Sequence, residues 1–275
     1  MSARLVNGRG SLFEAGLMVC HCLLLETKDG LALVDTGLGT EDCADPALRL
    51  GRGFGVAARP RLDPAETALA HVTRLGFQRE DVRHLVPTHL DLDHAGGLPD
   101  FPGATVHIFR PEHDAAMSPR TTIEKHRYRA PHWAHGPKWH LLDVAEGGDS
   151  WFGFDSVRAL GGTDDEVLLV PTIGHTRGHC AVAVRTSDGW LLHAGDAYFF
   201  DAEMDATRPR CTPALAAFQR IAAIDDQARV SNQQRLRALA RDHGSEVRIF
   251  CAHSPVELAS FVECGTDSST LGSPP

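Results

Sequence analysis

Two histidines and two aspartates crowd into the six residues from His89 to His94. His89, Asp91 and Asp93 alternate, so an extended backbone would turn all three to one side, and His94 follows where the chain bends towards a pair of glycines. Imidazole and carboxylate ligands together suit zinc, iron or manganese. In the alternative interpretation this stretch is a polar loop in which Asp93 caps a helix. So many potential ligands in one loop favour half of a metal site.

Three later segments each present a histidine or an aspartate beside a predicted strand. His179 precedes an alternating apolar run, within a glycine-rich turn that also contains His175. Asp196 and His253 each follow an apolar run of their own. One such residue at a strand end is more often structural than functional. Four strand ends that offer ligands in one chain favour a common metal site.

The order and spacing of these segments resemble the metallo-β-lactamase superfamily. Its pattern is a His-x-His-x-Asp-His loop, a later Gly-His-Thr-x-Gly-His turn, a Gly-Asp pair and a final histidine after a strand. Residues 22–37 resemble the opening hairpin of that family, in which two strands meet at a glycine turn and the second ends in Asp-Thr-Gly. The chain departs from the pattern at Asp91, which replaces the second histidine of the loop.

The resemblance implies two divalent metal ions that share one carboxylate. It implies a first ion held by His89, Asp91 and His179, a second held by Asp93, His94 and His253, and Asp196 as the bridge. Zinc is the expected metal, and Asp91 leaves manganese or iron open, because a carboxylate hardens the first site. His175 is expected to stabilise its turn by hydrogen bonding, and His193 has no counterpart in the family.

Such a site predicts hydrolysis by hydroxide. Two ions that share a water lower the pKa of that water from roughly 15.7 towards about 7. We expect Asp93 to orient the hydroxide and to pass its proton to the leaving group. Tyr198, two residues beyond Asp196, is a candidate donor to the oxyanion, as in lactonase-like members of the family. Alternatively, Tyr198 is a buried residue that packs beneath the loop.

We therefore expect a metal-dependent hydrolase that cleaves a small ester or lactone. One alternative is a thioester hydrolase of the glyoxalase II type. Another is a non-catalytic metal-binding or ligand-sensing module on the same scaffold. The second alternative is disfavoured, because a binding module has no need for a bridged metal pair.

The elements around these segments indicate an α/β fold, since strands followed by helices recur in both halves of the chain. The resemblance implies a four-layer αβ/βα sandwich of two mixed sheets with helices outside and with the metals at one edge. We expect a single domain over residues 1–264 and a frayed tail over 265–275.

Periodicity places the main elements. A helix that begins at Asp63 is predicted to bury an apolar stripe made of Ala65, Ala68, Leu69, Val72 and Leu75. The second half is predicted to contain strands near 156–160, 166–170, 180–185, 189–194 and 246–252, and helices near 213–224 and 230–242.

Residues 111–150 form a segment rich in histidine, arginine and tryptophan between the two halves. We expect a lid or a pocket wall, because a segment between the halves of such a sandwich lies near the metal edge. Arginine and aromatic side chains also suit an organic acid or an aryl substrate. The alternatives are a third metal site, an oligomer contact or an ordinary pair of packed helices.

Composition excludes several classes of function. The formal charge of −9 disfavours nucleic-acid binding, because phosphate backbones call for a basic surface. No apolar run approaches the roughly 18 residues that span a bilayer, and the N-terminus has no hydrophobic signal core. We expect a cytoplasmic protein that acts on a small molecule and binds neither nucleic acid nor membrane, and we leave a homodimer open. Seven scattered cysteines fit free thiols in a reducing compartment.

Overall fold

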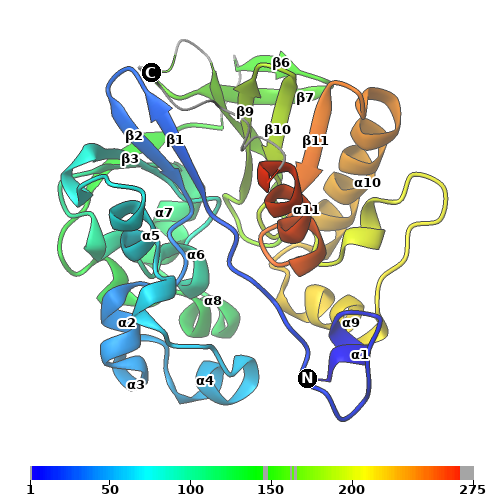
Figure 1. Ribbon diagram of the computed structural model, residues 1–275, viewed down its shortest axis with the longest axis horizontal. Helices are drawn as coiled ribbons and strands as arrows, with labels where there is room; N and C mark the ends of the chain where they lie inside the picture. The colour runs from blue at the N-terminus through cyan, green and yellow to red at the C-terminus, as the bar shows by residue number, and fades with distance from the viewer. Residues whose placement is uncertain (1, 145–147, 162, 164–165, 267–275) are drawn as a thin grey trace, which may run out of the picture.

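The computed structural model describes residues 2–144, 148–161, 163 and 166–266, and places their strands in two facing sheets (Figure 1). The first sheet has the strand order β1-β2-β3-β4-β5 and the second has the order β11-β10-β9-β8-β7-β6. In the first sheet β1 is antiparallel to β2, and β2 to β5 run parallel. In the second, β10 and β11 are parallel and the other described pairs are antiparallel. The expected α/β fold of two mixed sheets with helices is confirmed.

The strands of the first sheet are β1 (Leu23–Thr27), β2 (Gly30–Val34), β3 (Val82–Val86), β4 (Thr105–Phe109) and β5 (Lys138–Leu142). Those of the second are β6 (Asp149–Trp151), β7 (Phe154–Ala159), β8 (Val167–Pro171), β9 (Cys180–Thr186), β10 (Gly189–His193) and β11 (Val247–Phe250). The α-helices are α1 (Ala3–Val6), α2 (Thr40–Ala44), α3 (Pro46–Arg49), α4 (Arg52–Ala58), α5 (Ala68–Arg74), α6 (Leu92–Ala95), α7 (Arg110–Met117), α8 (Thr122–Arg127), α9 (Pro213–Ala222), α10 (Asp226–His243) and α11 (Pro255–Thr266). The 3₁₀ turns are η1 (Pro64–Glu66), η2 (Arg79–Asp81), η3 (Leu98–Asp100), η4 (Ala130–Trp133) and η5 (Asp201–Met204).

The alternation of side chains along each strand explains the layers. On β9, Cys180 and Val182 lie in the apolar cluster between the sheets, which Ala32 of the first sheet also joins. The intervening Ala181 and Ala183 lie in a second cluster, together with residues of α10 on the outer face. A third cluster fills the outer face of the first sheet beneath α5 and α7. Because successive strand residues point to opposite faces, strands that are apolar on both faces require cover on both sides.

The helix predicted from Asp63 is divided into two elements. Asp63 caps the 3₁₀ turn η1, and Thr67 then caps α5 as a new start. Val72 is buried as expected, but Ala65 is exposed and Leu75 is 65% exposed. The prediction of one continuous apolar stripe is therefore wrong at both ends, because the restart at Thr67 changes the helical phase and Leu75 lies beyond the last helical residue.

Two expectations about chain organisation meet the structure in part. Residues 138–142 form β5, the edge strand of the first sheet, so part of the segment 111–150 belongs to the sandwich itself. α11 continues to Thr266, and the rest of the predicted tail lies outside the described residues. Within the described ranges, no helix is both long and apolar enough to cross a membrane.

Candidate metal centre

The ligand-type residues converge at one edge of the sandwich, beyond the ends of several strands. β3 ends at Val86, β10 at His193 and β11 at Phe250, each shortly before such a residue. His94 from the first half and His253 from the second half approach within 3.3 Å, measured between their Nε2 atoms. Sites in α/β folds commonly form beyond the carboxyl ends of strands, where loops of different strands meet. The two halves of the chain thus share one centre.

The first pocket groups His89, Asp91, His175 and Asp196. His175 Nε2 lies 3.1 Å from Asp91 Oδ2 and 3.4 Å from Asp196 Oδ2. His89 Nε2 lies 3.4 Å and 3.7 Å from the same two oxygens. Two imidazoles and two carboxylates around one point form a donor set that suits zinc, iron or manganese.

The second pocket groups His94, His253 and Asp196, with Asp93 at its rim. His253 Nε2 lies 3.0 Å and His94 Nε2 lies 3.3 Å from Asp196 Oδ1. Asp93 Oδ2 lies 3.7 Å from His253 Nε2, and its side chain is 22% exposed. Asp196 therefore turns one oxygen to each pocket and is the residue that the two pockets share.

Buried atoms without hydrogen bonds show that the pockets fit cations. His89 Nε2, Asp91 Oδ1 and Asp196 Oδ1 are buried and have no hydrogen-bond partner in the structure. A buried polar atom without a partner costs free energy, and native structures rarely leave three together. A divalent cation in each pocket would satisfy His89 Nε2 and Asp196 Oδ1, because both atoms lie among the other ligand-type side chains.

Neighbouring groups orient the imidazoles so that Nε2 faces the pockets. Asp35 accepts a hydrogen bond from His94 Nδ1 at 2.8 Å, and the Val19 carbonyl accepts one from His253 Nδ1 at 2.7 Å. The Asp35 carboxylate also accepts hydrogen bonds from the backbone and hydroxyl of Thr88, beside His89. Such contacts set the tautomer and leave the other ring nitrogen for a metal. The sequence pattern identifies Asp35 only as part of the Asp-Thr-Gly that ends the opening hairpin.

Charges within the two pockets shift the pKa values in opposite directions. In the first pocket, burial and the neighbouring Arg127 lower the pKa of His175 to about 4. In the second pocket, burial works against the charged imidazole, but the carboxylates of Asp196 and Asp93 prevail and raise the pKa of His253 to about 9. Burial also raises the energy of charged Asp196, yet His253 and His94 hold its pKa well below the usual range.

His179, expected from the sequence as a ligand, does not join the first pocket in the structure, and His175 from the same turn lies there instead. The Nδ1 atom of His179 donates to the Thr172 carbonyl at 3.0 Å, and its Nε2 accepts from the backbone N–H of Asp196 at 2.9 Å. Both ring nitrogens are thus occupied by the protein. A Cβ at Gly195 would lie 2.7 Å from this ring, so the close approach requires glycine. His179 supports the bridging aspartate from behind.

Tyr198 also lies away from the pockets. Its side chain is fully buried in the cluster beneath α10, and its hydroxyl donates to Glu257 Oε1 at 2.8 Å. The structure therefore places Tyr198 as in the alternative interpretation, as a buried residue that packs beneath the loop. The next residue, Phe199, reaches the site instead, and its ring stacks on that of His253 at 5.1 Å between centroids. Tyr198 and Phe199 are adjacent in sequence, yet only the side chain of Phe199 points to the site.

Arg127 from α8 compensates for the unusual aspartate of the first pocket. Its Nη1 lies 3.3 Å from Asp91 Oδ2 and donates to the His175 carbonyl at 3.1 Å, while Nη2 donates to the Ala222 carbonyl. Burial disfavours a charged Asp91, but Arg127 and His89 hold its pKa well below the usual range. One negative and one positive charge sum to zero, as for a neutral imidazole. The extra charge expected at the first site is therefore largely offset.

Glu112 from α7 ties the two ligand loops of the first pocket together. It is fully buried and accepts hydrogen bonds from Leu90 N and Gly178 N, each at 3.0 Å. Tyr128 donates its hydroxyl to the same carboxylate. A Cβ at Gly178 would lie 2.4 Å from the backbone of Glu112, so this packing requires glycine. In the segment 111–150, α7 and α8 thus brace the ligand loops, a role that its composition did not reveal.

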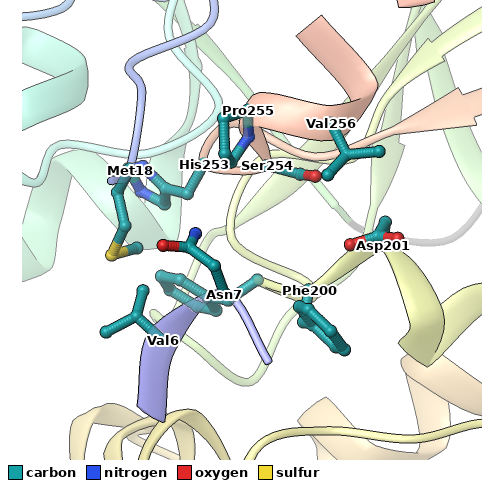
Figure 2. Close-up of a pocket in the computed structure, with 10 residues that line it drawn as sticks. Val6, Asn7, Met18, Phe200, Asp201, His253, Ser254, Pro255 and Val256 are labelled. Carbon is teal, nitrogen blue, oxygen red and sulfur yellow. The ribbon is translucent and has the colours of Figure 1, made fainter. Parts of the chain in front are cut away.

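A small hollow of about 10 Å³, which has room for about one water, lies beside His253 (Figure 2). Figure 2 shows the N-terminal arm supplying Val6, Asn7 and Met18 on one side, and Phe200, Asp201 and Val256 facing them on the other. A second, wider hollow shares Asn7, Phe200, Asp201 and Val256 with the first and continues away from the metal centre. The second hollow, of about 340 Å³, is the one with room for an organic group, and Val6, Met18 and Val256 place hydrocarbon surface at the narrow end beside His253.

Comparison with known sequences agrees with the geometry. Residues 15–241 match the profile of the metallo-beta-lactamase superfamily. A probable metallo-hydrolase of Mycobacterium tuberculosis is 42% identical over 238 residues, which cover 86% of this chain and 75% of that protein. An N-acyl homoserine lactonase of Rhizobium johnstonii is 28% identical over 240 residues, which cover 86% of this chain and 82% of the lactonase.

A solved structure gives the same result for the fold. An N-acyl homoserine lactone hydrolase, with the product N-hexanoyl-L-homoserine bound at its catalytic metal centre, superposes with a TM-score of 0.65. The alignment covers 94% of this chain and 91% of that one at 23% sequence identity. At this identity the likeness establishes a shared fold.

Proposed function

This chain belongs to the metallo-β-lactamase superfamily and is a metal-dependent hydrolase, and we propose that it uses two divalent cations to open a small lactone or to cleave a related ester. The observation that carries the proposal is the position of Asp196, which turns one oxygen to each of two clusters of ligand-type side chains. The similarity to an N-acyl homoserine lactonase over most of the chain supports a lactone as substrate.

We assign the ligands from the geometry of the pockets. The first cation is assigned to His89, Asp91, His175 and Asp196, and the second to Asp93, His94, His253 and Asp196. Zinc remains the first choice, because imidazole and carboxylate oxygen are both good zinc ligands and Arg127 offsets the added charge of Asp91.

We assign the steps of ester hydrolysis to the residues of the centre as follows. When bound, divalent cations supply hydroxide at neutral pH and polarise the carbonyl oxygen. Asp93 has the most exposed carboxylate of the centre, 22% against 16% for Asp91, and we assign it the role of orienting the attacking water and accepting its proton. Asp93 then returns that proton to the leaving alkoxide oxygen as the acyl carbon–oxygen bond breaks. The products are a carboxylic acid and an alcohol, joined in one molecule when the substrate is a lactone.

The oxyanion receives no help from a phenol in this proposal. The sequence contains two tyrosines, and both hydroxyls are committed, that of Tyr198 to Glu257 and that of Tyr128 to Glu112. Phe199 presents an apolar ring at the place where a hydroxyl was expected. Stabilisation of the developing negative charge therefore depends on the cation pockets.

The hollow beside His253 favours a substrate with an apolar tail. Val6, Met18, Phe200 and Val256 offer hydrocarbon surface next to the second pocket. An acyl tail would lie over this surface and extend into the adjoining wider hollow of about 340 Å³, with its ester group at the two ligand clusters. A phosphodiester substrate would place charged oxygens against the same surface at a cost in desolvation.

Metal analysis and a substrate screen test the proposal together. Purified protein should contain close to two ions per chain after loading with zinc, and should hydrolyse acyl lactones of increasing chain length faster than matched phosphodiesters. Protein treated with a chelator should lose this activity and regain it when zinc is added back. Fewer than one ion per chain, with no activity on any lactone or ester after addition of zinc, manganese or iron, would contradict the proposal and favour a sensing module.

A further inference from the structure

Cys20 lies in a segment that the backbone clamps against the second pocket. Val19 N donates to the His253 carbonyl at 3.4 Å, and His21 N donates to the Ala252 carbonyl at 2.9 Å. The Val19 carbonyl also accepts the hydrogen bond from His253 Nδ1. The residues on both sides of Cys20 are therefore tied to the loop that carries His253, which fixes where the Cys20 side chain can reach.

The sulfur of Cys20 lies close to two residues of the second pocket. Its Sγ, a carboxylate oxygen of Asp93 and a ring nitrogen of His253 all lie within 4.8 Å of one another. A separate observation marks the same pocket as a cation site, because Asp196 is 3% exposed and its Oδ1 atom has no hydrogen bond there. The geometry thus adds a sulfur donor to a pocket that otherwise offers nitrogen and oxygen.

We propose that Cys20 is a thiolate ligand of the cation in the second pocket, in addition to Asp93, His94, His253 and Asp196. The inference rests on the proposed metal centre and adds a ligand to it. On binding, the S–H bond breaks, a metal–sulfur bond forms and one proton leaves to solvent. The thiolate is a soft donor, so it favours zinc or cadmium over manganese in this pocket.

The other cysteines differ from Cys20 in their surroundings. Cys22 packs against the apolar cluster of the first sheet. Cys180 and Cys251 are buried. In the described part of the chain, Cys20 is the cysteine that joins a cation cluster. Cys43 on α2 is partly exposed and belongs to no such cluster, so Cys43→Ser is a matched control for Cys20→Ser.

Cobalt substitution tests the proposal with a readout other than activity. Reduced, metal-free protein loaded with Co²⁺ should show a thiolate-to-cobalt charge-transfer band in the near ultraviolet, beside the visible d–d bands. Cys20→Ser should lose the charge-transfer band and keep visible bands, while Cys43→Ser should keep both. Visible bands without a charge-transfer band in the unaltered protein, or a band that persists in Cys20→Ser, would overturn the role of Cys20 alone. If no cobalt binds at all, both this role and the proposed metal centre are overturned.

Alkylation gives an independent measurement on the unaltered protein. Cys20 is exposed, so a small thiol reagent should modify it in the metal-free protein. Loading with zinc should slow its modification several-fold, as read from the mass of the Cys20 peptide, and should leave the rate at Cys43 unchanged. An equal rate at Cys20 with and without zinc would count against a metal–sulfur bond.

Discussion

The two cation pockets share Asp196 but differ in their surroundings and in their access to solvent. Asp91 of the first pocket is held by Arg127, and both helices of the segment 111–150 brace its loops. The second pocket faces the N-terminal arm, with Cys20 exposed at its edge and the Asp93 side chain 22% exposed. The first pocket is thus balanced in charge by Arg127 of α8, and the second lies beside the small hollow next to His253.

The two pockets also differ in how strongly protons compete with a metal ion for the ligand side chains. His175 in the first pocket has a pKa of about 4, and that of Asp91 is held below its usual range. In the second pocket, burial disfavours the charged imidazoles of His253 and His94. The neighbouring carboxylates outweigh this and raise the pKa of His253 to about 9 and that of His94 well above its usual value. Because a metal binds the deprotonated ligand, cations meet more competition from protons in the second pocket.

Removing the shared carboxylate should have the largest effect. Asp196→Ala takes one ligand from each pocket, so we expect loss of at least one ion and a fall in activity of about a thousandfold or more, given the several kcal/mol that metal ions contribute to catalysis. Metal content and steady-state rates measure this. His193→Ala is the comparison, because both His193 ring nitrogens bond to backbone groups, and it should retain both ions. Equal effects of the two changes would refute the ligand assignment.

Replacing either of the two histidines in the turn 175–179 by alanine should have the next largest effect. His175→Ala should empty the first pocket and lower activity by about a hundredfold, while His179→Ala should keep two ions and lose stability by about 1–3 kcal/mol through its broken hydrogen bonds. Zinc content and thermal unfolding distinguish the variants. Two ions in His175→Ala with one in His179→Ala would restore the assignment made from the sequence.

Removing the carboxylate that pairs with Arg127 in the first pocket should have an intermediate effect, which is on the stability of the fold. Asp91→His leaves Arg127 buried without its carboxylate partner, which should cost about 3 kcal/mol of stability. Adding Arg127→Met should recover a good part of that loss, because the unpaired charge is then absent. Thermal unfolding of the two single variants and the double variant measures the coupling. Additive effects would show that the pair is not coupled and that the pockets differ less than we propose.

Acidification should produce the smallest and most selective effect. As the pH falls from about 9 towards 6, His253 and His94 bind protons in the metal-free protein, so zinc affinity should decline in the second pocket first. His175 stays neutral over this range, so the first pocket should hold its ion. Zinc titrations at several pH values would reveal one affinity that depends on pH and one that does not. Parallel loss of both ions would remove the distinction.

Local residue patterns were sufficient to predict the type of site and much of the fold. The loop from His89 to His94 predicted ligands at a sheet edge because its spacing is a local property, and apolar runs predicted β7 to β11 of the second sheet but not β5 or β6, which lie in the segment 111–150. The same reasoning failed where the helix after Asp63 restarts at Thr67.

What only the tertiary structure decided is which atoms face the cations. His175 and His179 occupy one short turn, and the choice between them depends on Thr172 and on the backbone of Asp196, which bond to the ring of His179. Arg127 and Cys20 reach the centre from parts of the chain that sequence spacing does not relate to it. Residue types and periodicity by themselves determined that this protein has a metal-binding sheet edge, because these are local properties. Side-chain direction and charge balance depend on packing between distant segments, so they became defined only in the folded chain.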